Sequence, residues 1–446
     1  MKNPSAPLYE GLLEHNRKNR ISFHTPGHKD GRFFHDCDLL KMDVTELPDT
    51  DALYEASGII LQAEQAAAAL FGAARTLFSA GGCTLCIQAM LRLLCPKGGR
   101  VLFGRNLHRS AVHAMALLGI DPVWGLPRPD AGTGLPGRIA AEEIKHAVEE
   151  NPDLQGVYLT TPDYYGCLTD LRELGGYLKG KGIPLVLDCA HGSHLPFIDK
   201  YYYLEIREAA AMVACSAHKT LPVLTGGAYL HIFDEAYVSG AKQAMALFGS
   251  TSPAYPVMAS LDRARAWLEW EETRPLWSAL EERVRTIKNG LLEKGFDLPV
   301  GRTDPVRLTF SGEKLGYTGK ELAEHLRAQG IEPEFSDGGW VVLIPTLMNR
   351  EGDFLRLEQA LGAIYPKTPL KLPDYRPFLP KKVLSPREAL LSEQVRVPLE
   401  EAAGRIAADS HCPCPPGVPV VMPGERLEEK SIEILRQSGI LTVNVI

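Results

Sequence analysis

The sequence predicts an α/β fold built on a mostly parallel, doubly wound sheet. Short apolar runs typical of buried strands alternate with longer stretches that have helical spacing, and this order favours parallel strands joined by crossover helices. The chain has 446 residues, of which 45% are hydrophobic and 23% are charged, so it can form a large core and more than one domain.

The alternation begins with a helix at residues 59–73, where IILQAEQAAAALFGA combines helical spacing with strong helix formers. The strand TLFSA follows and leads through the turn GGCT into a second helix, LCIQAMLRLLC. Two further pairs of strand and helix come next, RVLFG with SAVHAMALLG and QGVYLTT with DLRELGGYLKGK. The strands IPLVLDCA, AAMVACSA and GGAYLHIF complete the predicted sheet.

The second half of the chain predicts a smaller α/β unit. A long helix beginning near Pro256 connects it to the sheet, and the stretches DPVRLTF, GKELAEHLRAQG and WVVLIPT indicate a strand, a helix and a strand. The proline-rich run at residues 365–378 is typical of a linker, and a last helix ends the chain.

Composition excludes several partners. The net charge of −7 gives no general attraction to nucleic acid or anionic lipid, so we expect neither as a partner. The first residues, MKNPSAPLYEG, lack the pattern of a secretory signal, and no apolar run approaches the roughly 18 residues of a membrane span. Nine cysteines without a tight framework fit free thiols in a reducing cytoplasm. Cys412 and Cys414 have no second cysteine pair, so no zinc site is expected there.

Four short polar segments lie at the ends of predicted strands, and ligands bind at such ends in an open α/β sheet. They are Gly81–Thr84, Thr160–Thr161, Asp188 and Ser216–Lys219. Because the carboxyl ends of parallel strands meet at one edge of a sheet, these four segments together indicate a single ligand site.

Gly82, Cys83 and Thr84 lie between a strand and a helix. At such a point the backbone N–H groups and the helix dipole favour a phosphate group. Taken alone, these residues are better explained by a plain turn in which Thr84 caps the helix.

Asp188 ends a predicted strand, where its carboxylate can bind a metal, act as a base or pair with a protonated ring nitrogen. A carboxylate that caps a neighbouring loop is the structural alternative. His191 and His194 follow it, but they lie on either side of Gly192 rather than on one clear helix face. The pattern is therefore a poor signal for a metal site.

Lys219 lies between an apolar strand and a glycine-rich turn, where burial favours the neutral, nucleophilic form of its amine. Such a lysine can form a Schiff base with a carbonyl cofactor, while Ser216 and His218 can hold a phosphate. A lysine whose amine reaches solvent is the commoner alternative. A phosphate cradle, an aspartate at one strand end and a lysine after a later strand together suit pyridoxal 5'-phosphate (PLP).

These motifs resemble those of the fold-type-I PLP enzymes, and specifically the bacterial ornithine/lysine/arginine decarboxylases in a short form without an N-terminal wing domain. The resemblance covers nearly the whole chain, and SAHKTLP together with TPGHK carries it most specifically. The other matching stretches are DVTEL, RNLHRSAVHA, LDCAHGSHLPF, STSPAYPVMASLD and PPGVPVVMPGE. The resemblance implies PLP-dependent decarboxylation of arginine, lysine or ornithine to the corresponding amine and CO2.

The resemblance also implies a division into four parts and a homodimer with shared active sites. We expect an N-terminal segment at 1–58 that contributes to the active site and the dimer, and a PLP-binding large domain at 59–265. A small α/β domain follows at 266–365, and a linker with a C-terminal domain follows at 366–446.

The family pattern gives each matching residue a role. It makes Lys219 the Schiff-base lysine and Asp188 the partner of the pyridinium nitrogen, while His108 stacks on the cofactor ring. His191 and the released Lys219 are candidate acids for protonating Cα. The phosphate ligands that it implies are Ser216 and His218 with the loop Gly82, Cys83 and Thr84, and Ser250 and Thr251 are further cofactor contacts that serve the partner subunit's site.

Two residues are expected at the substrate. The resemblance places His28, in TPGHK, and Glu425, in MPGE, in the substrate-binding region, where Glu425 balances the distal cation of a basic amino acid. Without the resemblance, His24, His28 and His108 are loop or capping histidines, and Glu425 is an exposed glutamate.

The chain departs from the family pattern at two places. Cys83 puts a thiol where a hydroxyl is common, a change that leaves the backbone phosphate donors in place. Ala52 and Tyr54 replace residues in a stretch often richer in Asp and His, which leaves the choice among arginine, lysine and ornithine open.

Three other functions remain alternatives. The first is another fold-type-I PLP enzyme, such as an aminotransferase or a lyase, acting on a different amino acid. The second is a metal-dependent hydrolase, whose metal ligands would come from His24, His28, Asp188, His191 and His194. The third is a non-catalytic homologue, which the presence of a Schiff-base lysine argues against.

Overall fold

The computed structural model describes residues 17–29, 31–33, 39–130, 133–135, 138–370, 377–411 and 418–446. Its largest element is a seven-stranded sheet with the strand order β2-β8-β7-β6-β5-β3-β4. The strands are β2 (Arg75–Ser79), β3 (Gly99–Gly104), β4 (Ile120–Gly125), β5 (Leu154–Thr160), β6 (Leu185–Asp188), β7 (Ala210–Cys215) and β8 (Ala228–Ile232). All neighbours from β7 to β4 run parallel, and β8 runs antiparallel to both of its neighbours. The predicted α/β fold with a mostly parallel sheet is confirmed.

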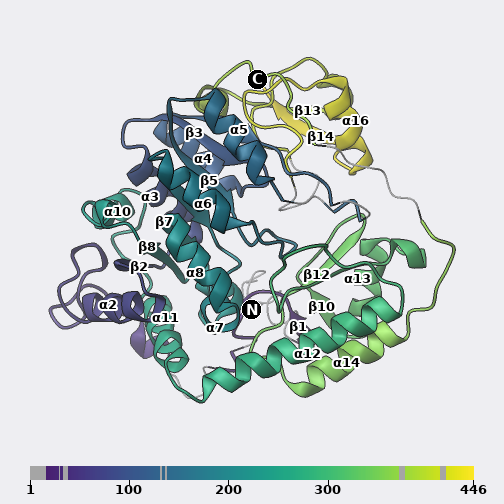
Figure 1. Cartoon of the computed structure of the whole chain (residues 1–446), viewed down its shortest axis with the longest axis horizontal. Helices are drawn as coiled ribbons and strands as arrows, with labels where there is room; N and C mark the ends of the chain where they lie inside the picture. The colour runs from purple at the N-terminus through teal and green to yellow at the C-terminus, as the bar shows by residue number, and fades with distance from the viewer. Residues whose placement is uncertain are drawn as a thin grey trace, which may run out of the picture.

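Side chains on the central strands alternate between two apolar cores, one on each face of the sheet. Leu185 and Leu187 of β6 belong to one core, whereas Val186 between them belongs to the other. Figure 1 shows helices covering both faces. Helices that pack into the first core include α5 (Ala141–Glu150), α6 (Leu171–Gly180) and α8 (Lys200–Ala209), and those in the second include α3 (Gly82–Leu94), α4 (Arg109–Leu118) and α10 (Ala241–Ala246).

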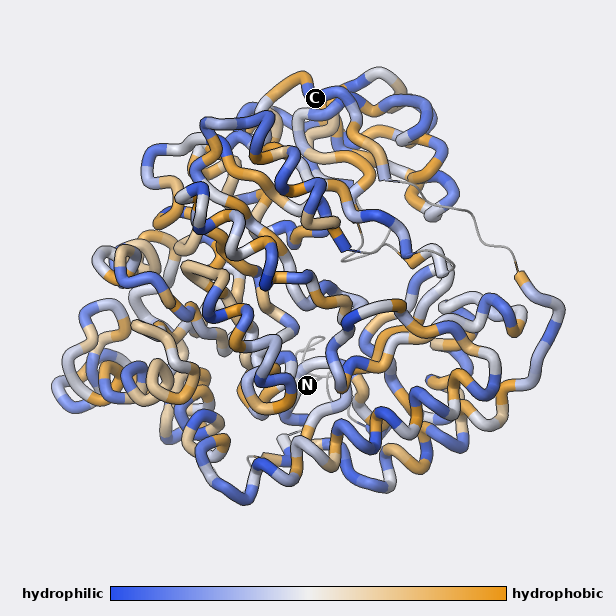
Figure 2. The backbone as a smooth tube through the Cα atoms, in the orientation of Figure 1, coloured by the Kyte–Doolittle hydropathy of each residue, from blue (hydrophilic) through white to orange (hydrophobic). Residues whose placement is uncertain are grey.

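A smaller unit is formed mainly by the chain after the large sheet, together with strand β1 from the N-terminal segment. It contains the antiparallel sheet β11-β12-β9, and next to it β1 pairs in parallel with β10. Figure 2 shows hydrophilic and hydrophobic residues alternating along its two long helices, as expected for helices with one buried face. Its elements are β1 (Ile21–Phe23), β9 (Leu308–Ser311), β10 (Ile331–Pro333), β11 (Phe335–Ser336), β12 (Trp340–Leu343), α12 (Thr273–Glu293), α13 (Gly319–Ala328) and α14 (Glu351–Gly362).

The connection between the two units is two helices rather than one. Helix α11 (Tyr255–Leu268) begins next to Pro256 as expected, but it ends before α12 begins. Pro275 accounts for the break, because proline is tolerated in the first turn of a helix and disrupts a helix interior. Among the described residues, the N-terminal half also contains the α-helices α2 (Ile59–Phe71), α7 (Leu195–Ile198) and α9 (Ala217–Thr220).

The C-terminal part packs beside the large sheet (Figure 1). It contains the antiparallel pair β13 (Val395–Pro398) and β14 (Thr442–Val445) and the helices α15 (Pro386–Leu391) and α16 (Glu429–Gln437). Across the residues that the structure describes, no helix is both long and apolar enough to cross a membrane.

Candidate active site

A cavity of about 570 Å³ lies at the carboxyl ends of the parallel strands. Its wall contains residues that directly follow β3, β5, β6 and β7, which is why sequence positions far apart converge on it. The expected site residues that line it are Gly82, Cys83, Thr84, His108, Asp188, His191, Ser216, His218 and Lys219.

Asp188 is the last residue of β6 and its side chain is buried. The hydroxyl of Tyr158 donates a hydrogen bond to Oδ2 of Asp188 at 3.0 Å, and the backbone N–H of Ala190 donates to Oδ1 at 3.0 Å. Burial and the negative charge of Asp188 raise the pKa of Tyr158 far above its usual range, so the phenol stays a donor. The two donors fix the orientation of the carboxylate in the cavity wall.

Lys219 lies in the short helix α9, directly after β7. Its Nζ atom is 2.9 Å from Nε2 of His191. Burial lowers the pKa of Lys219, and the negative charge of Asp188 partly opposes that shift. The amine therefore faces a shared cavity with Asp188, and its neutral form is favoured relative to an exposed lysine.

His191 is buried between two basic side chains. Nη1 of Arg307 lies 3.3 Å from Nδ1 of His191, and because a guanidinium can only donate, Nδ1 acts as the acceptor. Burial, followed by the positive charges of Lys219 and Arg307, lowers the pKa of His191 far below its usual range. The ring is therefore neutral, and its one proton is on Nε2, facing Lys219.

His108 has two structural roles at once. It is the N-cap of α4, where its side chain accepts a hydrogen bond from the backbone N–H of Ser110 at 3.3 Å, and it also lines the cavity. Desolvation lowers the pKa of His108, while the charge of Asp188 opposes that change. The two expected roles of His108, as a helix cap and as a site residue, are therefore compatible.

The first turn of α3 forms another part of the wall. Gly82 has a φ of +69°, which glycine adopts without strain, and its N–H donates to the carbonyl of Gly226 at 2.8 Å. The N–H groups of the turn that follows have no partner within the helix and are suited to an anion. Burial raises the pKa of Cys83 far above its usual value, so its thiol stays protonated. On the same wall, Nδ1 of His218 lies 3.0 Å from the carbonyl oxygen of Gly227.

Four expected site residues lie outside this wall. Ser250 and Thr251 are exposed on the loop that follows α10. His28 accepts a hydrogen bond at Nδ1 from the N–H of Gly31 at 2.8 Å. These residues do not contact the cavity within one chain.

Glu425, the fourth, has a cationic partner inside the protein. Its carboxylate is only 3% exposed and binds the fully buried Arg105 through both oxygens, at 2.7 and 2.6 Å. Arg105 also donates to the carbonyls of Pro419 and Val420, and Pro419 lines the cavity. This ion pair therefore joins the C-terminal part to the loop that contains His108.

Sequence reasoning missed several side chains at the site, among them Tyr164, Arg307 and Glu334. Tyr164 follows β5 in the stretch TTPDYYG, and a polar aromatic pair after a strand is a signal that could have indicated it. Arg307 and Glu334 come from the smaller unit, and nothing in their local sequence distinguishes them from surface charges. Glu334 lines the cavity, and Arg307 contacts it through His191.

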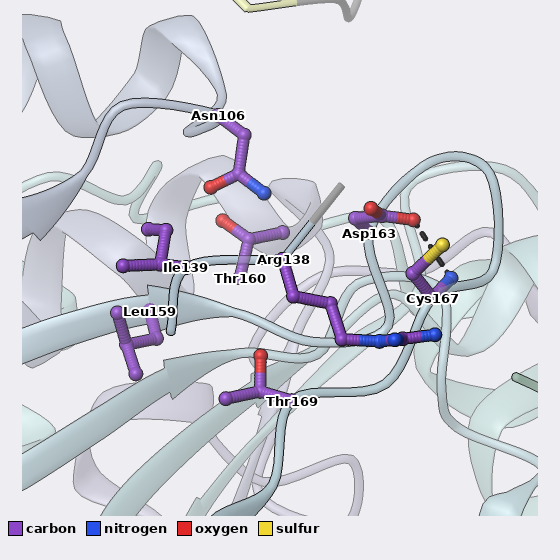
Figure 3. A pocket seen from close by; sticks show the side chains of 8 residues that line it. All are labelled: Asn106, Arg138, Ile139, Leu159, Thr160, Asp163, Cys167 and Thr169. Atoms are coloured by element: carbon purple, nitrogen blue, oxygen red, sulfur yellow. Dashed lines mark hydrogen bonds between the residues drawn. The ribbon is translucent and has the colours of Figure 1, made fainter. Parts of the chain in front are cut away.

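A small polar hollow adjoins the main cavity and shares Asn106 and Thr160 with it (Figure 3). Among the described side chains, Oδ1 of Asn106, Oγ1 of Thr160 and Nε of Arg138 are buried there without a hydrogen-bond partner. Burial raises the pKa of Asp163 to about 7, although the hydrogen bond that it accepts from the backbone N–H of Cys167 lowers the pKa in part. Such unpaired polar groups suit an ordered water or a polar part of a ligand.

The histidines and acids named for a hydrolase do not gather around one point. His194 binds Asp304 at 2.9 Å, whereas His191 contacts Lys219 and Arg307. Within the described ranges, His, Cys, Asp and Glu side chains form no group of three that could hold a metal ion.

The sequence of the chain is similar to those of known decarboxylases. Residues 6–300 match the family described as "Orn/Lys/Arg decarboxylase, major domain", and residues 373–438 match "Orn/Lys/Arg decarboxylase, C-terminal domain". A Bacillus subtilis protein named "Uncharacterized protein YaaO" is 35% identical over 97% of this chain and 94% of its own length. An arginine decarboxylase from Bacillus anthracis is 32% identical over 97% of this chain and 93% of its own.

Solved structures show the same fold at lower identity. The constitutive lysine decarboxylase of E. coli is 20% identical, has a TM-score of 0.77, and is matched over 99% of this chain and 82% of that chain. A structure of SPT with PLP as the internal aldimine is 13% identical, has a TM-score of 0.59, and is matched over 77% of this chain and 86% of that chain. The predicted fold-type-I architecture is confirmed.

Proposed function

The chain belongs to the Orn/Lys/Arg decarboxylase family, and we propose that it converts a basic amino acid into the corresponding amine and CO2 with PLP as its cofactor. Family membership supports the reaction type. The relative from Bacillus anthracis is named for arginine, which makes arginine the first substrate to test. Lysine and ornithine are the other candidates.

The residues around the cavity fit PLP. A volume of about 570 Å³ is within the usual range for a small-molecule site. Lys219 supplies an amine whose pKa burial lowers, and Asp188 supplies a carboxylate fixed by two donors in the same cavity. Thr160 and Asn106 line it with buried oxygen atoms that have no partner among the described residues, so a polar ligand would satisfy them.

Each group of residues would hold a different part of the cofactor. Lys219 would bind the aldehyde carbon, Asp188 would hold a proton on the pyridine nitrogen, and the His108 ring would stack on the pyridine ring. The phosphate would lie at the first turn of α3, with Ser216 and His218 beside it. All of these side chains line the one cavity, which supports this assignment.

When bound, PLP supplies an aldehyde that condenses with a primary amine and a conjugated ring that accepts the electron pair left by the departing carboxyl group. Asp188 supports that role because its fixed negative charge keeps the ring nitrogen protonated. Nε2 of His191 carries a proton next to Nζ of Lys219, so these two atoms are the candidates to deliver a proton to Cα of the substrate.

One observation carries the proposal: a partly buried lysine and a buried aspartate line the same cavity at the strand ends of a family member. The test supplies the purified protein with PLP and with arginine, lysine or ornithine in turn, and measures CO2 and the amine. Lys219→Ala is expected to abolish both turnover and the visible absorbance of the bound cofactor. A keto acid in place of an amine, or normal turnover by Lys219→Ala, would contradict the proposal.

We also infer a homodimer in which each subunit completes its partner's site. The exposure of Ser250 and Thr251 outside the cavity of their own chain supports this inference. A mixture of Lys219→Ala subunits with Ser250→Ala/Thr251→Ala subunits should regain activity that neither variant has alone. A mixture as inactive as its components would indicate sites made by single chains.

A further inference from the structure

We propose that Glu334 binds the positively charged far end of the substrate and selects basic amino acids over neutral ones of the same length. The proposal rests on the decarboxylase function proposed above and names the specificity residue of that site. It replaces Glu425 in this role, because the carboxylate of Glu425 is already paired with Arg105.

Glu334 and Asp188 are the carboxylates among the described residues that line the cavity. Asp188 lies at the end of β6, and Glu334 directly follows β10 in the smaller unit. The two acids therefore reach the cavity from different parts of the fold. A substrate held at its α-amino end near Lys219 can present a distal cation to Glu334.

Two hydrogen bonds orient the Glu334 carboxylate. The N–H of Thr25 donates to Oε2 at 2.8 Å, and the hydroxyl of Tyr164 donates to Oε1 at 2.8 Å. Each oxygen accepts one of these bonds, which leaves each oxygen free to accept another. Two oriented, partly used oxygens match the paired N–H groups of a guanidinium better than the single point charge of an ammonium.

The charge of Glu334 is not balanced by a neighbouring base. In the part of the chain that the structure describes, no lysine or arginine forms an ion pair with it, and its hydrogen bonds come from neutral donors. Burial lowers the pKa of Lys219, and the negative charge of Glu334 is among the charges that oppose the shift. The carboxylate is thus within electrostatic reach of the reacting amine, and among the described side chains no lysine or arginine is ion-paired with it.

The decisive comparison uses arginine and citrulline, which have the same length but differ in distal charge. For the wild type we expect kcat/KM for arginine to exceed that for citrulline by roughly 100-fold or more. Glu334→Gln should lower kcat/KM for arginine by about 30-fold or more, mainly through KM, and change the value for citrulline less than about threefold. The visible absorbance of bound PLP should persist in the variant.

Glu332→Gln is the matched control. Glu332 is a glutamate two positions away that pairs with Arg20 and Arg327 and does not line the cavity. This control should keep the arginine to citrulline ratio of the wild type. The role of Glu334 would be overturned if the arginine to citrulline ratio of kcat/KM changed equally in both variants, or did not change in Glu334→Gln. In either case, turnover of arginine by the wild type would still support the decarboxylase function.

A second variant keeps the test informative if Glu334→Gln does not fold. Glu334→Asp retains the charge but places it one methylene group further from the substrate. The kcat/KM for a longer basic substrate such as arginine should therefore rise relative to the value for a shorter one such as ornithine. An equal loss for all three basic substrates would contradict the proposal. Absence of amine production by the wild type from any basic amino acid would overturn the decarboxylase function and this inference together.

Discussion

The Nζ atom of Lys219 lies 2.9 Å from Nε2 of His191, and Arg307 contacts the other nitrogen of the same ring at 3.3 Å. Burial and the two neighbouring positive charges lower the pKa of His191 far below its usual range, so the ring is neutral. Since Arg307 donates to Nδ1, the ring proton is on Nε2. The Nε2–H of His191 therefore faces Nζ of Lys219, whose neutral amine can accept a hydrogen bond from it.

Replacing His191 should slow the reaction without removing the cofactor. His191→Asn deletes the proton on Nε2 next to Lys219, and loss of a positioned acid or base typically lowers a rate by about 100-fold or more. We expect that fall in kcat, measured as amine formation, together with a retained visible absorbance of bound PLP. An unchanged kcat would show that Lys219 supplies the proton without His191.

Arg307 should set the pH dependence through His191. Arg307→Gln removes a positive charge beside the ring, so the pKa of His191 should rise and the ring should protonate at a higher pH. The acidic limb of the kcat profile should move to higher pH in this variant. Arg307→Lys retains the charge and should leave the limb closer to its wild-type position. A limb that does not move in Arg307→Gln would contradict the coupling.

His231 should make the fold sensitive to acid. It is buried on β8, and burial lowers its pKa from 6.5 to about 3. Because its pKa is lower in the folded state, the unfolded chain binds the proton more readily, so stability is full above about pH 6.5 and falls as the pH decreases. Between pH 7.5 and pH 5 this residue should remove about 2 kcal/mol from the free energy of unfolding.

Urea unfolding at those two pH values tests this contribution. His231→Gln removes the titrating ring, so its free energy of unfolding should change less between the two pH values than that of the wild type. The same pH dependence in both proteins would assign acid sensitivity to other buried histidines.

The ion pair between Arg105 and Glu425 should contribute to stability. Both side chains are buried, and removal of one partner leaves the other charge without a counterion. Glu425→Gln should therefore lower the free energy of unfolding by about 3–5 kcal/mol. The double variant Arg105→Met/Glu425→Leu should lose less than the sum of the single variants, as measured by urea unfolding. Additive losses would mean that the two residues act independently.

The sequence predicts much of the site because strand ends are local features. Asp188, Ser216 and Lys219 each follow a short apolar run, and a parallel sheet brings such positions to one edge. The histidine at the start of α4 required the family resemblance, because its capping role alone explains its position.

The missed residues depend on contacts between distant segments. Glu334 reaches the cavity because β10 pairs with β1, which places Thr25 beside its carboxylate. Arg307 becomes relevant only where the smaller unit packs against His191. No local pattern encodes either contact. The domain boundaries and the roles of Ser250 and Thr251 stay predictions.

The pairing of β1 with β10 has a consequence for how the protein acquires its activity. Ile21 and Ile331 are partners in this pair although about 310 positions separate them along the chain. Closing so large a loop has an entropic cost, which the contacts formed on closure must offset. We therefore expect this pairing to form after the local helices and strand pairs. During refolding, helical circular dichroism should accordingly recover before substrate selectivity does.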